Sequence, residues 1–88
     1  MNILWDQNKN EWLMVNRGIS FEEISDKILN NDYLEIFENT TREDQLYFIM
    51  NIKNYTWVIP FLIGKKNQIV LKTAFPGNKF QKKYGVKK

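Results

Sequence analysis

The sequence predicts an α+β fold, in which two N-terminal helices pack on an antiparallel β-meander and a short C-terminal helix follows. Three observations carry this prediction. Helix-capping residues flank two segments in the first third of the chain. Farther on, apolar residues recur with the period of two that is typical of strands, and short polar turns separate these segments. Because short connections join antiparallel neighbours, we expect a single domain over residues 1–88 with the helices on one face of the sheet.

A first helix is predicted over residues 7–17. Asp6 stands at the N-cap position, where its carboxylate can accept hydrogen bonds from the free amides of the first helical turn. Gly18 follows as the stop residue, since glycine readily adopts the left-handed conformation that ends many helices. Asn8, Trp12 and Val15 fall on one side of this helix, with Leu13 nearby, and we expect a short apolar face there.

The second helix has the stronger signal. Residues 20–23, Ser-Phe-Glu-Glu, form a capping box, in which the serine hydroxyl and the second glutamate each satisfy a free backbone amide. Phe21, Ile24 and Ile28 then recur at helical spacing and predict the buried face. Asn30 is expected to end this helix, which should run antiparallel to the first.

The strands are predicted from alternating apolar residues. Two long segments, residues 46–52 and 55–63, are joined by a tight turn at Lys53 and Asn54. Pro60 lacks an amide hydrogen, which predicts an edge or a bulge in the second segment. The other predicted elements are strands over residues 2–5, 33–38 and 68–74, a turn at residues 64–67, and a helix over residues 79–84 capped by Asn78.

Charge is distributed unevenly along the chain. Residues 1–44 hold all ten acidic residues and four basic ones, for a net charge of −6. Residues 45–88 hold nine basic residues, all lysine, for a net charge of +9. A lysine-rich segment without carboxylates attracts polyphosphates, because each neutralised phosphate releases condensed counterions. The charge pattern therefore favours a nucleic-acid partner.

Two absences narrow the chemistry. The sequence has no cysteine and no histidine, which excludes a zinc enzyme, a Ser-His-Asp hydrolase and a histidine-dependent ribonuclease. We expect neither a metal nor a cofactor.

The N-terminus has no signal-peptide pattern, and no apolar stretch approaches the ~20 residues of a membrane span. We expect a cytoplasmic protein that does not contact the membrane.

Basic and aromatic side chains are the candidates for a functional site. In the strand over residues 68–74, alternation predicts Lys72 on the face of the sheet away from the helices. Lys79 and Lys83 are four residues apart, so their charges repel on a helix unless an anion lies between them. A solvated basic tail is the alternative. The aromatic residues on or near the sheet suit either the core or base stacking: Tyr47, Tyr55, Trp57, Phe61, Phe75 and Phe80.

Three segments together resemble a known family, the BrnT-type toxins of bacterial type II toxin–antitoxin pairs. The resemblance covers roughly residues 3–84, and its most specific parts lie in the helical half. The strands match only in pattern. The segments are Trp5-Asp6-x-x-Lys9-Asn10, Arg17-Gly18-Ile19-Ser20-Phe21-Glu22-Glu23 and Phe80-x-Lys82-Lys83-Tyr84.

This resemblance implies a RelE-like fold and an endoribonuclease that inhibits translation. It also implies a cognate antitoxin that masks the toxin, an RNA substrate (mRNA, free or on the ribosome), and DNA contact only through the antitoxin complex. Members of that wider group promote attack of a ribose 2′-hydroxyl on the adjacent phosphate with basic side chains.

By motif position, the resemblance implies catalytic roles for Lys72 and Lys79. For such an enzyme we also expect Tyr84, or else Tyr55, to transfer a proton. RNA binding is assigned to Lys65, Lys66, Lys82 and Lys83. The chain departs from the family where Gly77 and Asn78 replace a common arginine, and residues 45–88 contain no arginine.

Two other interpretations remain open at this point. The chain can be a non-catalytic protein that binds nucleic acid or acts as one half of a regulatory complex. It can also bind only protein, with the basic half holding an acidic partner. Cleavage products that end in a 2′,3′-cyclic phosphate distinguish the enzyme from both.

Overall fold

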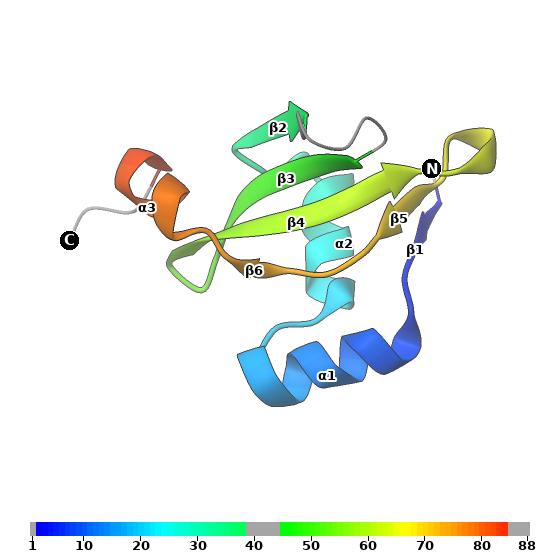
Figure 1. Ribbon diagram of the computed structural model, residues 1–88, viewed down its shortest axis with the longest axis horizontal. Coiled ribbons are helices and arrows are strands. Elements are labelled where there is room, and N and C mark those ends of the chain that lie inside the picture. The colour runs from blue at the N-terminus through cyan, green and yellow to red at the C-terminus, as the bar shows by residue number, and fades with distance from the viewer. Residues whose placement is uncertain (1, 39–44, 85–88) are drawn as a thin grey trace.

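A computed structural model describes residues 2–38 and 45–84 and confirms the predicted α+β fold (Figure 1). The helices and strands follow the predicted order, and the predicted N-cap at Asp6 and C-cap at Gly18 are both formed. The elements in chain order are β1 (Ile3–Leu4), α1 (Gln7–Arg17), α2 (Phe21–Leu29), β2 (Glu35–Glu38), β3 (Gln45–Ile52), β4 (Tyr55–Ile63), a 3-10 turn (Lys65–Asn67), β5 (Ile69–Leu71), β6 (Phe75–Pro76) and α3 (Asn78–Tyr84).

The strands form one mixed sheet. Its order is β1-β5-β4-β3-β2, and β6 pairs with β4 as well. The pairs from β2 through β5 are antiparallel, which confirms the predicted meander. β1 pairs with β5 in the parallel direction and forms one edge of the sheet, with β2 at the other edge. The sequence predicted a short strand over residues 2–5 but not its partner.

The hydrophobic core lies between the sheet and α2, which passes behind β3 and β4 in Figure 1. Every second residue of the two long strands points toward it, as expected for period-two alternation. The buried side chains on this face are Phe48, Met50 and Ile52 of β3, Trp57, Ile59 and Phe61 of β4, and Phe21, Ile24 and Ile28 of α2. The predicted buried face of the second helix is therefore confirmed.

The prediction that the two helices run antiparallel is wrong. In Figure 1, α1 lies across the bottom of the molecule, while α2 runs upward behind the sheet. Asn10, in the first half of α1, is fully buried and contacts the start of α2. Its Oδ1 accepts a hydrogen bond from the Phe21 amide at 2.6 Å, and its Nδ2 donates to Glu22 at 2.6 Å. The start of α2 is thus held against the side of α1, so the second helix leads away from the first.

The predicted apolar face of α1 is wrong for Trp12 and Val15 but right for Leu13. Asn10 and Leu13 are the buried residues of this helix, whereas Val15 is 84% exposed. Trp12 is 42% exposed, with the Lys9 ammonium 4.3 Å and the Arg17 guanidinium 4.9 Å from its ring centroid. Asn10 faces the interior because its side chain forms two hydrogen bonds with α2. These bonds, rather than the spacing of apolar residues, determine which side of α1 is buried.

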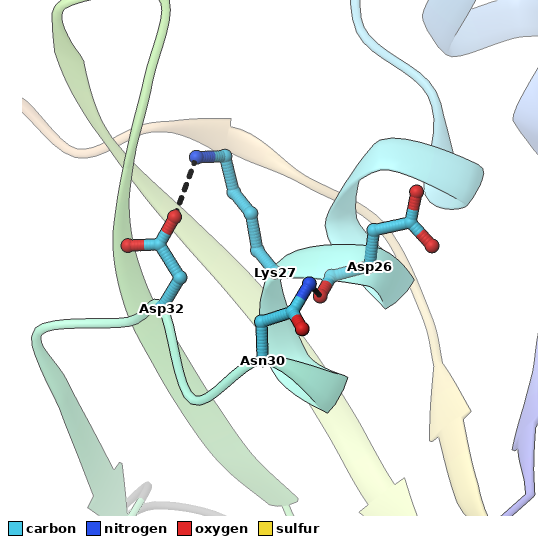
Figure 2. A network of polar contacts seen from close by, with 4 residues as sticks. All are labelled: Asp26, Lys27, Asn30 and Asp32. Carbon is cyan, nitrogen blue, oxygen red and sulfur yellow. Dashed lines mark hydrogen bonds and ion pairs between the residues drawn. The ribbon is translucent and has the colours of Figure 1, made fainter.

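The end of α2 directs the chain toward β2 (Figure 2). Asn30 ends the helix, as predicted, and its backbone and side-chain nitrogens both donate to the carbonyl of Asp26. Lys27 forms an ion pair with Asp32 at 3.3 Å, and the Asp32 amide donates to the Lys27 carbonyl at 2.7 Å. These contacts turn the chain back along the sheet.

Pro60 interrupts the last strand. The predicted strand over residues 68–74 is shorter in the structure, because β5 ends at Leu71. The Lys72 amide still donates to the Pro60 carbonyl at 2.9 Å, but proline has no amide hydrogen to return. The ladder therefore breaks at this point, as the proline predicted.

A one-residue bulge follows this break. Leu71 lies opposite Phe61. Three residues farther along, an uninterrupted ladder would pair Ala74 with Val58, but Phe75 takes that place. Ala74 is fully buried in the core, although strict alternation along residues 68–74 would place it on the same face as Lys72. The extra residue of the bulge accounts for this difference.

Candidate nucleic-acid interface

The face of the sheet away from α2 carries the candidate site. Directly paired residues point to the same face, so Tyr47 of β3 lies beside Pro60 of β4. Lys72 bonds to Pro60 from the other side and continues this row. The neighbouring row pairs Val58 with Phe75. Lys72 is exposed, which agrees with the predicted face for this side chain.

Helix α3 attaches to one end of this face by hydrogen bonds to the start of β4. The Tyr55 hydroxyl donates to Asn78 Oδ1, and the Thr56 amide donates to Gln81 Oε1 at 2.8 Å. The Gly77 amide donates to the Thr56 carbonyl at 2.9 Å, directly before the helix. The orientation of α3 is thus set by the residues that open β4.

A pocket of about 420 Å³ lies between α3 and the sheet. Aromatic rings form much of its wall, and Val58 is part of that wall. Gly77 allows α3 to approach closely, because a Cβ atom there would lie 2.7 Å from Val58 Cγ2 and 3.4 Å from the Phe80 ring. The pocket is lined by Tyr47, Val58, Phe75, Pro76, Gly77, Asn78, Lys79 and Phe80.

The predicted basic residues divide between the two ends of β4. Lys79 lines the pocket and is exposed, and Lys82 and Lys83 lie on the same helix. Tyr84 is the last residue of α3, and its side chain is outside the described part of the chain. Lys79 thus shares with Lys72 the face that lies away from α2.

Lys65 and Lys66 lie elsewhere. They form the 3-10 turn between β4 and β5, at the end of the sheet opposite α3 (Figure 1). Ile63, which precedes the turn, and Trp57, which pairs with β6, are six residues apart on β4, or about 20 Å at the rise of a strand. The structure therefore does not bring these two lysines to the pocket.

The separation of charge in sequence is only partly a separation in space. The acidic first half also supplies β2, where Glu35 lies opposite Ile49 and thus on the same face as Tyr47.

Among residues 2–38 and 45–84, no group of three or more His, Cys, Asp or Glu could hold a metal ion. Within those same ranges, no helix is long and apolar enough to cross a membrane.

The structure sorts the aromatic candidates. Trp57 and Phe61 point into the core, and Tyr55 packs against it. Tyr47, Phe75 and Phe80 line the pocket on the other face. Sequence reasoning named all of these rings but missed this grouping. Alternation along β3 and β4 could have separated Tyr47 from the core set, whereas the position of Phe75 depends on the bulge.

Comparison with known proteins supplies one match in structure. No family model matches the sequence, and no curated protein matches it. The chain is similar in structure to the Brucella abortus ribonuclease toxin BrnT, whose crystal structure was solved at 1.1 Å resolution. The TM-score is 0.66, the identity is 17%, and the match covers 88% of this chain and 96% of the BrnT chain. The chain has the BrnT fold.

The BrnT fold confirms, at the level of architecture, the resemblance seen in the helical segments. In this chain, those segments form the caps and the stop that shape α1 and α2. They set the positions of α1 and α2, whereas Lys72, Lys79 and the pocket lie on the sheet face away from α2. The likeness to BrnT therefore leaves the roles of Lys72, Lys79 and Tyr84 as predictions.

Proposed function

We propose that this protein is a metal-independent endoribonuclease toxin that cleaves mRNA and thereby inhibits translation. The observation that carries the proposal is its BrnT fold, which it shares with a protein described as a ribonuclease toxin. The position of Lys72 and Lys79 on the sheet face that α2 does not cover supports it. As partners we propose a cognate antitoxin that masks this face in the bacterial cytoplasm, and DNA only through the complex with that antitoxin.

The proposed reaction is an internal transfer within the RNA backbone. The ribose 2′-oxygen forms a bond to the adjacent phosphorus and loses its proton to solvent water, while the bond from phosphorus to the 5′-oxygen breaks and that oxygen takes up a proton. The products are a 2′,3′-cyclic phosphate and a 5′-hydroxyl end. Negative charge grows on the phosphate oxygens during attack, and nearby ammonium groups stabilise it.

Lys72 and Lys79 are the proposed source of that stabilisation. We assign to Tyr84 the transfer of a proton to the leaving 5′-oxygen. Tyr55 fits this role less well, because its hydroxyl already donates to Asn78 and thereby holds α3. Lysine meets phosphate as a point charge, whereas arginine binds it through two parallel hydrogen bonds, so we expect orientation of the RNA to depend on further contacts.

Induced expression in a bacterial host tests this function. The wild-type protein should arrest growth and yield RNA fragments with 2′,3′-cyclic phosphate ends. The Lys72→Ala/Lys79→Ala double variant should lose both effects. If the wild-type protein yields no such fragments, the enzyme proposal fails; if the double variant cleaves as well as the wild type, only the site assignment fails.

A second double variant controls for net charge. Lys65→Ala/Lys66→Ala removes the same two charges at the far end of β4. We expect it to weaken RNA binding while leaving the cleavage rate at saturating RNA close to that of the wild type. An equal loss of cleavage rate in both double variants would show that overall charge, rather than position, determines activity.

The absence of arginine from residues 45–88 supports one alternative, a non-catalytic nucleic-acid-binding or regulatory protein. Such a protein would bind RNA in a salt-sensitive manner and leave it intact. Purified protein incubated with labelled RNA distinguishes the two functions, since binding without cyclic-phosphate products supports the alternative.

A further inference from the structure

We propose that the pocket between β3, β6 and α3 binds one unpaired base of a single-stranded RNA, stacked on Tyr47 and Phe75. The proposal rests on the proposed function in one respect, namely that the ligand is RNA. It adds a site for the base to a mechanism that so far involves only the phosphate and ribose.

The first support is the composition and size of the pocket. Its aromatic rings come from three elements: Tyr47 from β3, Phe75 from β6 and Phe80 from α3. Its volume of about 420 Å³ lies within the ~300–1,000 Å³ that is usual for sites of small molecules. Proteins that bind single strands stack bases on aromatic rings of this kind.

The second support is the exposure of Phe75. Phe75 is 36% exposed on a strand of only two residues, whereas Trp57 and Phe61 of the neighbouring β4 are buried in the core. The bulge after Leu71 places Phe75 opposite Val58, on the pocket side of the sheet. Without the extra residue, Ala74 would occupy that position. Because of the bulge that follows the break at Pro60, the aromatic ring of Phe75 faces the pocket in place of the methyl group of Ala74.

The third support is the charge around the pocket, which decides between possible occupants. Lys79 is itself a lining residue, and Lys72 lies in the next row of the same face. An apolar side chain of a protein partner would gain nothing from these ammonium groups. A nucleotide places a flat, stackable base and an anionic phosphate within one residue of each other. Its base fits the rings while its phosphate meets the lysines, so we assign the pocket to RNA.

Binding of a non-cleavable oligonucleotide tests the inference separately from catalysis. The probe is a fluorescent single-stranded RNA with 2′-O-methyl groups, which cannot attack the phosphate. A second probe of equal length and charge lacks its bases. We expect the wild-type protein to bind the base-containing probe at least about tenfold more tightly, because stacking contributes most of the difference.

Two variants locate this preference. Tyr47→Ala and Phe75→Ala should each lose about fivefold or more in affinity for the base-containing probe and change little toward the base-free probe. Tyr47→Phe keeps the ring and should retain the wild-type affinity. Trp12→Ala is the matched control, because this exposed aromatic residue lies on α1, away from the pocket.

The outcomes separate the two proposals. Equal affinity of the wild-type protein for both probes would overturn the base pocket, even if the protein cleaves RNA. The same conclusion follows if Tyr47→Ala and Phe75→Ala bind like Trp12→Ala. A base-dependent affinity that these variants remove supports the pocket, even if no cleavage is detected. Because the comparison of probes uses the wild-type protein, it remains decisive if a variant fails to fold.

Discussion

The buried side chain of Asn10 bonds to the backbone amide of Phe21 at 2.6 Å, and this contact joins the two helices. Phe21 is the first residue of α2, and its amide has no partner within the helix. Ser20 satisfies the amide of Glu23 through the capping box, so Asn10 supplies from α1 an acceptor that the box does not provide. The helix start is therefore satisfied partly by local and partly by tertiary contacts.

Replacing Asn10 with alanine should destabilise the protein strongly. The change leaves the buried Phe21 amide without an acceptor and removes a partner of Glu22, at a cost of about 2–4 kcal/mol in the free energy of unfolding. Chemical denaturation measures this cost. Asn16→Ala, at an exposed position of the same helix, should change the free energy by about 0.5 kcal/mol or less. Similar values for the two variants would refute the role of Asn10.

The ion pair between Lys27 and Asp32 should contribute little. The two side chains are 27% and 70% exposed, and exposed pairs of this kind are worth about 1 kcal/mol or less. Asp32→Asn should therefore lower the free energy of unfolding by less than ~1 kcal/mol, and less still in high salt. The backbone bond from Asp32 to Lys27 is retained in this variant. A larger, salt-independent loss would indicate a structural role for the carboxylate itself.

Local signals predicted most of the fold. The bounds of β4 agree with the predicted residues 55–63, and β3 differs from its prediction by one residue. The N-cap at Asp6 and the capping box at Ser20 were also predicted, since both depend on residues within one helical turn. What the sequence could not reveal depends on contacts between distant segments. Asn10 is buried because of a residue in another helix, a contact that helical periodicity does not encode.

The site shows the same division between local and distant effects. Alternation predicted the exposed face for Lys72, and the structure agrees. The break in the last strand depends on Pro60 of the neighbouring strand, so the pattern of residues 68–74 alone predicted one continuous strand. As a result, the sequence could not place Phe75 in the pocket, and only the folded chain shows that Tyr47 and Phe75 line the same pocket.

Gly77→Ala should reduce both stability and activity. The new Cβ atom would lie 2.7 Å from Val58 Cγ2, so α3 must move away from the sheet. Overpacking of this kind costs about 1–3 kcal/mol, and the shift also displaces Lys79 from the pocket. Thermal unfolding and RNA cleavage below the transition measure the two effects. Gly64→Ala is the control, because its nearest contact of 3.4 Å requires little adjustment and it lies at the other end of β4.

The salt dependence of RNA binding should identify the lysines that meet phosphate. For single strands, the logarithm of affinity falls with the logarithm of salt concentration by about 0.7 for each phosphate neutralised. Lys79→Ala should therefore reduce this slope by about 0.7, and Lys79→Arg should leave it unchanged because the charge remains. Lys53 is the matched control, since its ammonium bonds to the Gly18 carbonyl on the helical side. If Lys53→Ala reduces the slope as much as Lys79→Ala, the cations act only through the net charge. A reduction found for both Lys79→Ala and Lys72→Ala, but not for Lys53→Ala, places the RNA backbone on the face of the sheet away from α2.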